Sequence, residues 1–333
     1  MRRLRVDPAA PDPVSIAAAA AILRAGGLVA FPTETVYGLG ADALDPAAVR
    51  RIFEAKGRPS FNPVIVHVAN TEQARRLARR WPAHAARLAN RFWPGPLTLV
   101  LPKDVAVPDI VTAGLDAVGI RVPAHPVALA LLRAADLPVA APSANRFTQL
   151  SPTTADHVAA AMGDRVDLLL DGGPATVGIE STVVDLTGPQ PRLLRPGMVS
   201  VAELEELVGP LLHTAADPAG DAPRLSPGQV ERHYAPRATL LLLTRAELEE
   251  LADRRGRGET GRTSLGAVLY SDARAPQHSQ VVRLPAQADG YASGLYAALH
   301  QLDAAGCDRI LVELPPEEPQ WNAVHDRLRR AAR

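Results

Sequence analysis

The sequence predicts an α/β protein with two domains joined by a linker. Helical and strand-like segments alternate along the chain, which is the pattern of an α/β fold. Residues 212–224 interrupt this alternation, because they are rich in Ala, Pro, Asp and Gly and show little apolar periodicity. The 333 residues, of which 47% are hydrophobic, are enough for two domains. We expect domains at residues 1–210 and 239–333, with a linker at 211–238.

The charge balance and the cysteine count exclude several classes of protein. The chain has 36 Lys plus Arg and 36 Asp plus Glu, so its formal net charge is zero. It therefore has no global field to attract nucleic acid or an anionic membrane, and an anion site must be local. Cys307 is the single cysteine, which excludes intramolecular disulfides and cysteine-cluster metal sites and fits a reducing cytoplasm. The basic Met1–Arg5 and the short apolar run Ala17–Leu23 lack a convincing cleavage site, so we expect an ordinary first helix.

The beginning of the chain predicts a helix followed by a strand. We expect the helix over Ser15–Arg24, capped by Ser15 and closed by Gly26-Gly27, and a buried strand over Leu28–Phe31. The next segment, Pro32–Gly40, contains two threonines, a glutamate, a tyrosine and two glycines. We interpret it as a strand-to-helix turn, which is where open α/β sheets present their ligands.

The glycines of this turn formally match a dinucleotide-binding fingerprint, Gly38-x-Gly40-x-x-Ala43. That fingerprint requires glycines directly after a strand and an acidic residue about 20 positions further on. Here other residues intervene, and the next strand offers His67 instead. The chain also lacks the Gly-x-x-x-x-Gly-Lys-Ser/Thr motif of P-loop proteins. The sequence therefore argues against a nicotinamide or P-loop site.

A basic stretch precedes the next strand. Lys56 and Arg58 lie two residues apart with Gly57 between them, so an extended backbone would point both side chains the same way. Such a pair would form an anion cradle. Two prolines stiffen the loop ahead of a buried strand at Val64–Val66, which carries His67 at its far end. From these residues alone, a solvated basic loop is an equally good interpretation.

An arginine lies inside an apolar strand further along. The predicted helices Glu72–Arg80 and Ala83–Phe92 and a strand entered through Trp93–Leu101 precede it. The strand Ala117–Val122 then contains a single charge, Arg121. A charge in the middle of a strand is costly to bury unless it meets a carboxylate or another anion. The alternative is an edge strand whose arginine faces water.

Three later loops carry hydroxyl groups or a lone cation at strand ends. Ser143 follows one apolar strand, Ser181 precedes another, and Arg195 ends a third. We expect Ser151 to be a helix N-cap with Pro152 at the first helical position, an arrangement that either holds a phosphate or simply caps the helix. Together these loops predict a site for an anionic, oxygen-rich ligand.

A second α/β domain is expected after the linker. Its sequence shows no catalytic or binding chemistry, and Arg254–Arg262 is predicted to be a polar, glycine-rich loop. The expected strands are Thr239–Leu243, Ala267–Tyr270, Val281–Leu284 and Arg309–Leu314, and the expected helices are Tyr291–Ala304 and Gln320–Arg330.

Spaced motifs run through the N-terminal domain in one register. They are PTETVYGL at Pro32–Leu39, KGRP at Lys56–Pro59 followed by Asn62-Pro63, PGPLT at Pro94–Thr98, GIRVP at Gly119–Pro123, PSAN at Pro142–Asn145, SPT at Ser151–Thr153, ESTVVD at Glu180–Asp185 and LRPG at Leu194–Gly197. On these motifs, the chain from about Ser15 to Val208 resembles the YrdC-type threonylcarbamoyl-AMP synthase domain. Ser226–Pro236, with the sequence SPGQVERHYAP, resembles the linker of two-domain members of this family.

The resemblance implies a YrdC-like twisted, open mixed sheet with helices, a linker that crosses the active site, and a smaller Rossmann-like C-terminal domain. It implies synthesis of L-threonylcarbamoyladenylate from L-threonine, bicarbonate or CO₂ and ATP, with release of pyrophosphate. The product would pass to the machinery that forms threonylcarbamoyladenosine at position 37 of tRNA. The implied location is the cytoplasm, without membrane contact, and any direct RNA binding is expected to be weak.

The resemblance also implies roles for individual residues. Lys56 and Arg58 would be the catalytic cations beside the phosphates, and Arg121 would take the carboxylate of threonine. Mg²⁺ would accompany ATP, with no metal site made by the protein alone. The implied threonine-binding residues are Thr35, His67, Arg121 and Ser181, and the implied ATP-binding residues are Arg58, Asn62, Ser143, Ser151, Arg195 and Tyr234.

Two segments depart from the family pattern. Arg146–Thr148 stands where the family usually has a small Ser-Gly pair, and Gln229–Glu231 is less basic than the usual linker. An RNA-binding module and a carbamoyltransferase for hydrogenase maturation are the alternative functions. Zero net charge and the lack of interleaved aromatic residues disfavour the first. The second requires cysteine zinc knuckles, which Cys307 alone cannot supply.

Overall fold

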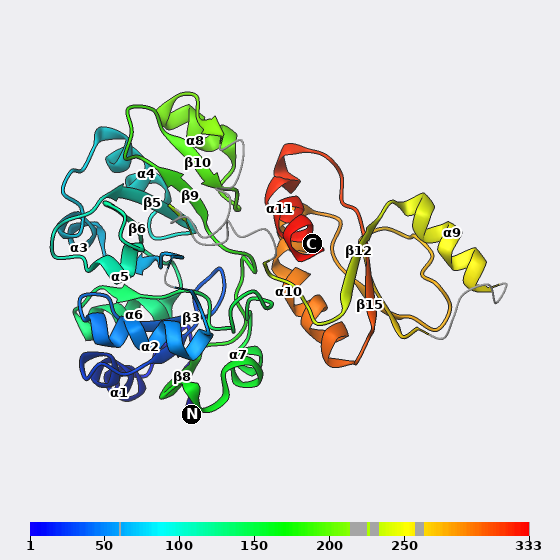
Figure 1. The fold of residues 1–333 in the computed structure, drawn as a ribbon, viewed down its shortest axis with the longest axis horizontal. Coiled ribbons are helices and arrows are strands. Elements are labelled where there is room, and N and C mark those ends of the chain that lie inside the picture. Colours follow the sequence, from blue (N-terminus) through cyan, green and yellow to red (C-terminus); the bar gives the residue numbers. More distant parts are fainter. Residues whose placement is uncertain (60, 214–224, 227–232, 257–262, 333) are drawn as a thin grey trace. The chain divides into compact units, whose positions relative to one another are not determined.

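The computed structural model describes residues 1–59, 61–213, 225–226, 233–256 and 263–332. Contacts divide the chain into two compact units. Unit 1 comprises Met1–Phe147 and Ser151–Val230, and unit 2 comprises Thr148–Leu150 and Glu231–Arg333. Each unit contains a sheet and helices, so the predicted α/β class is confirmed (Figure 1). Much of the expected linker, residues 214–224 and 227–232, lies outside the described residues.

Unit 1 is built on a mixed sheet whose described strands have the order β1-β8-β2-β3-β7-β4-β6-β5-β9-β10-β11. Helices pack against this sheet (Figure 1). The strands are β1 (Arg2–Arg5), β2 (Val29–Phe31), β3 (Gly38–Asp42), β4 (Val66–His67), β5 (Leu97–Pro102), β6 (Ala117–Arg121), β7 (Val139–Ala140), β8 (Leu168–Asp171), β9 (Thr182–Asp185), β10 (Arg192–Arg195) and β11 (Leu212–His213). The helices are α1 (Pro13–Arg24), α2 (Pro46–Lys56), α3 (Thr71–Arg76), α4 (Ala83–Phe92), α5 (Asp109–Thr112), α6 (Pro126–Ala135), α7 (Ala155–Met162), the 3₁₀ turn η1 (Gly163–Arg165) and α8 (Val201–Val208).

The central strands of the sheet of unit 1 are buried on both faces. Val29 and Phe31 pack in one apolar cluster, while Leu28 and Ala30, which alternate with them, pack in another. All residues of β5 are buried. Strands covered on both sides read as continuous apolar runs instead of alternating ones, which is why these segments were recognisable in the sequence.

The segment Pro32–Gly40 forms a hairpin loop and the first residues of β3, and not the expected strand-to-helix turn. β3 pairs antiparallel with β2 directly after it. A Cβ atom at Gly40 would come within 2.8 Å of the Phe31 ring and of Val139. This glycine therefore allows close packing of neighbouring strands, which is a different role from the phosphate-binding turn that the fingerprint implies.

Several helix boundaries differ from the predictions because other residues provide the caps. Asp12, and not Ser15, caps α1 through two backbone N–H groups. α3 ends at Arg76, short of the predicted Arg80. The cap of α7 is Thr154, so the helix starts at Ala155 and not directly after Ser151. A side chain caps a helix only where its own backbone leaves the helical conformation, and the sequence does not show where that happens.

Unit 2 is a parallel sheet with the strand order β12-β15-β13-β14 among its described residues. Helix α9 was not predicted, because it buries only Leu248 and Ala252 and so has little apolar periodicity. Arg254 and Arg255, expected in a loop, lie in its last turn, and residues 257–262 lie outside the described residues. The elements are β12 (Thr239–Leu243), α9 (Arg245–Gly256), β13 (Leu265–Leu269), β14 (Gln280–Arg283), α10 (Ala288–Ala304), β15 (Arg309–Glu313), the 3₁₀ turn η2 (Pro319–Trp321) and α11 (Asn322–Ala331).

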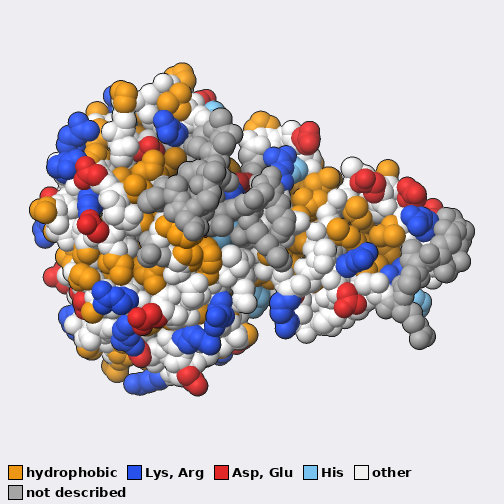
Figure 2. All heavy atoms as spheres, in the orientation of Figure 1, with side chains coloured by type: hydrophobic (Ala, Val, Ile, Leu, Met, Phe, Trp, Pro, Cys, Tyr) orange, Lys and Arg blue, Asp and Glu red, His pale blue; other side chains and the backbone are white. Residues whose placement is uncertain are grey.

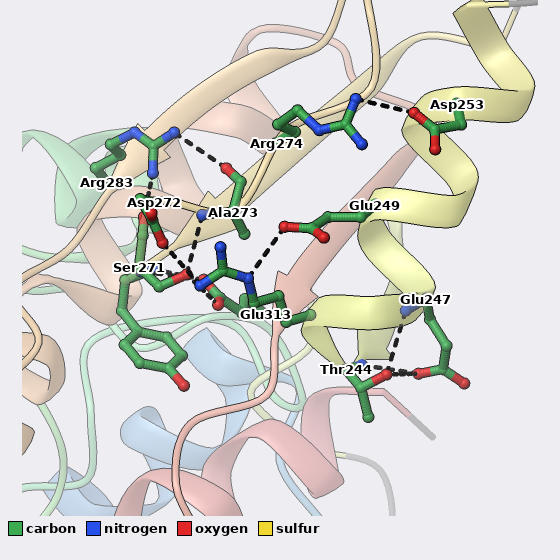
Figure 3. Close-up of polar contacts among 12 residues, drawn as sticks. Thr244, Glu247, Glu249, Asp253, Ser271, Asp272, Ala273, Arg274, Arg283 and Glu313 are labelled. Atoms are coloured by element: carbon green, nitrogen blue, oxygen red, sulfur yellow. Dashed lines mark hydrogen bonds and ion pairs between the residues drawn. The ribbon is translucent and has the colours of Figure 1, made fainter.

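A polar cluster lies at the carboxyl ends of the strands of unit 2 (Figure 3). Glu313, the last residue of β15, accepts hydrogen bonds from the Tyr270 and Ser271 N–H groups and from the Ser271 hydroxyl. Arg245 forms an ion pair with Asp272 in the same loop. These contacts hold the loop that follows β13 against the end of β15.

No helix in the described part of the chain is long and apolar enough to cross a bilayer. On the face drawn in Figure 2, basic and acidic side chains are interspersed among the described residues. This distribution matches the formal net charge of zero.

Candidate functional site

Neighbouring strands of unit 1 align a row of polar residues. His67 on β4 is the register partner of Arg121, which ends β6. β5 begins beside that end of β6, and β9 begins beside the start of β5. Arg195 ends β10 next to the start of β9, which Ser181 directly precedes. The sheet therefore brings together side chains that are widely separated in the sequence.

Arg121 lies on an interior strand, because β6 is placed between β4 and β5. The alternative of an edge-strand arginine that faces water is therefore wrong. Its Nε donates to the Gly95 carbonyl at 3.1 Å, its Nη1 donates to Thr35 Oγ1 at 2.8 Å, and Glu34 Oε1 lies 2.7 Å from its Nη2. Two N–H groups of the guanidinium thus donate hydrogen bonds, while Nη2 is ion-paired with Glu34 but makes no hydrogen bond within the described residues.

His67 is buried and uncharged. Burial and the nearby charge of Arg121 lower the pKa of His67 to about 3, so the ring is neutral at physiological pH. The Phe31 ring packs against it edge-on, at 6.3 Å between ring centroids. His67 Nδ1 has no hydrogen-bond partner within the described residues. Buried polar atoms are almost always paired, so this nitrogen is a candidate contact for a ligand.

Ser181 connects the row of strand ends to a wider hydrogen-bond network. Arg195 Nε donates to the Ser181 carbonyl at 3.1 Å, and Arg195 Nη2 donates to Ser181 Oγ at 3.2 Å. The Ser181 and Thr98 hydroxyls are 2.8 Å apart. The neighbouring Glu180 accepts a hydrogen bond from Ser151 Oγ at 2.5 Å. The predicted site residues Ser151, Ser181 and Arg195 are thus brought together.

The predicted phosphate site at a helix N-terminus is wrong for Ser151. α7 begins only at Ala155, and Thr154 accepts its capping hydrogen bond. The Pro152 carbonyl accepts a hydrogen bond from Tyr37 N at 2.8 Å, so this segment is held in the loop beside β3. Ser151 itself is buried and faces Glu180, which keeps it a candidate without a contribution from a helix dipole.

Lys56 is the last residue of α2, and Gly57 ends that helix in the left-handed conformation with φ 62°. The expected extended cradle of Lys56 and Arg58 is therefore wrong. Lys56 Nζ instead donates to the carbonyls of Ser143 at 2.6 Å and Asn145 at 2.5 Å. Burial, with a further contribution from the charge of Arg58, holds the pKa of Lys56 well below its usual value. This buried amine has no carboxylate partner among the described residues.

Arg58 and Asn62 contact each other ahead of β4. Arg58 Nη2 donates to Asn62 Oδ1 at 2.8 Å and to the Pro63 carbonyl at 2.7 Å. Asn62 is fully buried, and its Nδ2 has no hydrogen-bond partner within the described residues. The guanidinium of Arg58 lies 5.8 Å from the centre of the Phe147 ring. Phe147, which departs from the family pattern, therefore packs on a predicted ATP-binding residue.

Tyr234 belongs to unit 2, where it is buried. The centre of its ring lies 5.9 Å from that of Tyr296 and 5.3 Å from the guanidinium carbon of Arg327. The predicted contact of Tyr234 with ATP remains a prediction.

Sequence reasoning missed three residues next to predicted ones. Glu34 and Glu180 directly precede Thr35 and Ser181 in their motifs, and both carboxylates are buried against the site. A signal was available for Glu34, because a buried arginine such as Arg121 requires a carboxylate. Phe147 had no such signal, since only the fold brings it to Arg58.

Two family models cover most of the chain. One, described as "Telomere recombination" and named for Sua5, YciO and YrdC, matches residues 21–197. The other, described as "Threonylcarbamoyl-AMP synthase, C-terminal domain", matches residues 199–333. Both units of the fold are therefore represented in known families.

Curated relatives and solved structures give the same result. A threonylcarbamoyl-AMP synthase from Pyrococcus abyssi is 44% identical over 321 residues, covering 94% of this chain and 93% of the relative. One from Bacillus subtilis is 42% identical over 326 residues, covering 96% and 93%. The crystal structure of P. abyssi Sua5 complexed with L-threonine matches with a TM-score of 0.91 and 42% identity, covering 99% of this chain and 97% of that chain. This chain therefore belongs to the threonylcarbamoyl-AMP synthase family.

Proposed function

We propose that this chain converts L-threonine, bicarbonate or CO₂ and ATP into L-threonylcarbamoyladenylate and pyrophosphate. The observation that carries the proposal is a pair of buried nitrogens, Asn62 Nδ2 and His67 Nδ1, without partners among the described residues. Both lie close to buried cations, Arg58 and Arg121. Open polar atoms beside buried positive charge favour an anionic ligand with several oxygens.

Threonine is assigned to the row of strand ends. Arg121 Nη2, which makes no hydrogen bond within the described residues, is assigned to the carboxylate of threonine. The neutral ring of His67 accepts a hydrogen bond in the tautomer protonated on Nε2. Two hydroxyl groups add to this half of the site: that of Thr35 accepts a hydrogen bond from Arg121, and that of Ser181 accepts one from Arg195. Membership in a family with a threonine-bound structure supports this half of the site.

ATP is assigned to the loops that border this row. The ATP-binding residues in this proposal are Arg58, Asn62, Ser143, Ser151, Arg195 and Tyr234, as the family motifs imply. Lys56 and Arg58 are proposed as the catalytic cations. Since Lys56 Nζ is engaged by the carbonyls of Ser143 and Asn145, we assign it to holding that loop while contributing positive charge near the phosphates.

The reaction requires no protein nucleophile. The amine of threonine forms a carbamate with CO₂, one carbamate oxygen attacks the α-phosphorus of ATP, and the bond to the β-phosphate breaks as pyrophosphate leaves. The protein must hold two anions together and balance the charge on the phosphates, which is the role given to Lys56, Arg58 and Arg195.

Mg²⁺ is proposed to enter with the triphosphate. No group of three or more His, Cys, Asp or Glu that could hold a metal occurs among the described residues. Mg²⁺ commonly binds substrate phosphates and keeps several waters, so buried hydroxyls such as Ser151 fit around a metal that the nucleotide brings. The metal would offset phosphate charge during the attack.

We also propose the wider setting that the motifs imply. Residues 1–210 would be the catalytic domain, 211–238 the linker that crosses the active site and 239–333 the accessory domain. The protein would work in the cytoplasm, and its product would pass to the machinery that modifies tRNA at position 37. Zero net charge fits a protein that hands over a small molecule and binds RNA only weakly.

The test is to incubate the protein with ATP, Mg²⁺, bicarbonate and threonine and to follow pyrophosphate. Release that requires both threonine and bicarbonate is the expected result. Omitting each substrate in turn is the control, and mass spectrometry identifies the adenylate. Tight RNA binding without turnover would favour the RNA-binding module instead.

A further inference from the structure

Three residues of the proposed nucleotide loop belong to unit 2. Thr148–Leu150 lie between Ser143 and Ser151 in the sequence, yet their contacts place them with Glu231–Arg333. Ala235 N donates to the Thr148 carbonyl at 3.0 Å, and Gln149 forms a parallel β-bridge with Ala235. The proposed nucleotide loop is thus paired, main chain to main chain, with the residue that follows Tyr234.

Tyr234 is held in an unusual backbone conformation. Its φ is 61°, in the left-handed region that non-glycine residues rarely adopt, and Thr148 has a φ of 67°. Such conformations cost about 1 kcal/mol or more and persist where surrounding contacts hold them. Contacts from other parts of unit 2 must therefore hold Thr148 and Tyr234 in these conformations.

Those contacts come from α10 and α11. The centroid of the Tyr234 ring lies 5.9 Å from that of Tyr296 of α10 and 5.3 Å from the guanidinium carbon of Arg327 of α11. The main chain of the preceding residue, His233, donates to the Arg330 carbonyl at 3.1 Å. The two helices thus hold the segment His233–Ala235, and Thr148 and Gln149 pair with Ala235 of this segment.

Arg327 is an unexpected residue for such a position. Its side chain is fully buried, and Asp326, at 2.5 Å, is its described carboxylate partner. A buried guanidinium is costly unless it is paired, and stacking on an aromatic face adds favourable energy. An apolar side chain would fill this space at lower cost, which indicates a role beyond packing.

We propose that Arg327 is a positioning residue for the nucleotide loop. By stacking on Tyr234 it fixes the segment His233–Ala235, whose pairing with Thr148 and Gln149 in turn fixes the loop between Ser143 and Ser151. This inference deepens the proposed function, since it rests on that loop binding ATP. Unit 2 would then order the nucleotide loop through Arg327, a buried residue of its own.

The test uses Arg327→Met, which keeps a long side chain and removes the charge, and Arg327→Lys, which restores a cation. Arg329→Ala, an exposed arginine on the same helix, is the matched control. In the full-length protein, the apparent KM for ATP is expected to rise about tenfold in Arg327→Met, to recover to within about threefold in Arg327→Lys, and to stay unchanged in Arg329→Ala. The KM for threonine should not change in any of them.

A second measurement separates positioning from turnover. Hydrogen exchange of the peptides that cover residues 146–150 and 233–237 should be faster in Arg327→Met and unchanged in Arg329→Ala. Tyr234→Leu should speed exchange in the 146–150 peptide with Arg327 still present, whereas Tyr234→Phe should not. These two variants keep the proposal testable if Arg327→Met does not fold.

Unchanged exchange at residues 146–150 in both Arg327→Met and Tyr234→Leu would overturn the inference, whatever the kinetics. An equal rise of both KM values would also overturn it, because that pattern indicates general loss of structure. If the wild-type protein releases no pyrophosphate, the proposed function fails, while the exchange experiment still decides whether Arg327 orders the loop.

Discussion

The candidate site of unit 1 and the polar cluster of unit 2 pair their basic residues in different ways. In unit 1, Lys56, Arg58 and Arg195 are buried and contact carbonyl, amide and hydroxyl oxygens. In the polar cluster of unit 2, Arg245 and Arg274 are largely exposed and form ion pairs with carboxylates (Figure 3). The cations of these two regions therefore lie in different electrostatic surroundings.

The difference indicates where ligand chemistry can occur. Neutral oxygens orient a buried cation without cancelling its charge, so the region keeps an attraction for anions. Exposed ion pairs are already compensated and screened by water, and they contribute little to stability. Unit 1 is accordingly the candidate for binding ATP and threonine, and the polar cluster of unit 2 organises its own loops.

The largest expected effect comes from removing the arginine assigned to threonine. Arg121→Ala should raise the KM for threonine about 100-fold with little change in the KM for ATP, because it removes charge-assisted hydrogen bonds to the carboxylate. Pyrophosphate release at varied threonine measures this. Arg245→Ala in unit 2 is the control and should leave both constants unchanged. An unchanged threonine KM in Arg121→Ala would remove the assignment.

The buried partner of Arg121 should matter for stability. Glu34→Gln leaves Arg121 without its counter-charge and is expected to lower the free energy of unfolding by about 2 kcal/mol. Because the carboxylate of threonine would replace the lost charge, threonine should raise the melting temperature more in the variant than in the wild type. Glu72→Gln, which breaks an exposed ion pair with Arg76, is the control and should have little effect. A smaller threonine response in Glu34→Gln would contradict this account.

A smaller effect is expected at the buried lysine. Lys56→Ala should lower kcat about tenfold while the KM for threonine stays constant, because a charge and two hydrogen bonds to the Ser143 and Asn145 carbonyls are lost. Single-turnover measurement of pyrophosphate isolates the chemical step. Lys103→Ala, which directly follows β5 at the end opposite the candidate site, is the matched control. A changed threonine KM with normal kcat would place Lys56 in the other half of the site.

The mildest expected effect is a pH dependence of stability. The pKa of His67 is about 3 in the folded state and about 6.5 when unfolded, so below pH 6.5 the unfolded chain binds a proton that the folded chain does not. The free energy of unfolding should therefore decrease as the pH is lowered. His67 alone should account for a loss of about 1 kcal/mol between pH 6 and pH 5. Denaturant unfolding at several pH values measures it. His67→Gln should show a shallower dependence, and parallel curves would show that His67 is protonated in the fold.

Local sequence was informative where one physical signal dominated. Buried strands such as those at Leu28–Phe31 and Thr239–Leu243 were visible as apolar runs, and the helix Ala83–Phe92 was predicted with its boundaries. The helix Arg245–Gly256 was missed, because a helix that buries few residues has little periodicity. The caps at Ser15 and Ser151 were wrong, since many Ser, Thr and Asp residues near a helix start compete for that role.

By itself, the sequence determined the α/β class, the family and the set of residues that carry the chemistry, because motif spacing and apolar runs are properties of the chain. Only the tertiary structure decided what each cation contacts. It placed Arg121 on an interior strand beside Glu34, turned Lys56 toward the Ser143 carbonyl, and paired the Thr148 loop with Ala235. The reason is that burial and pairing depend on residues distant in sequence, and these set the charge that remains available to a ligand.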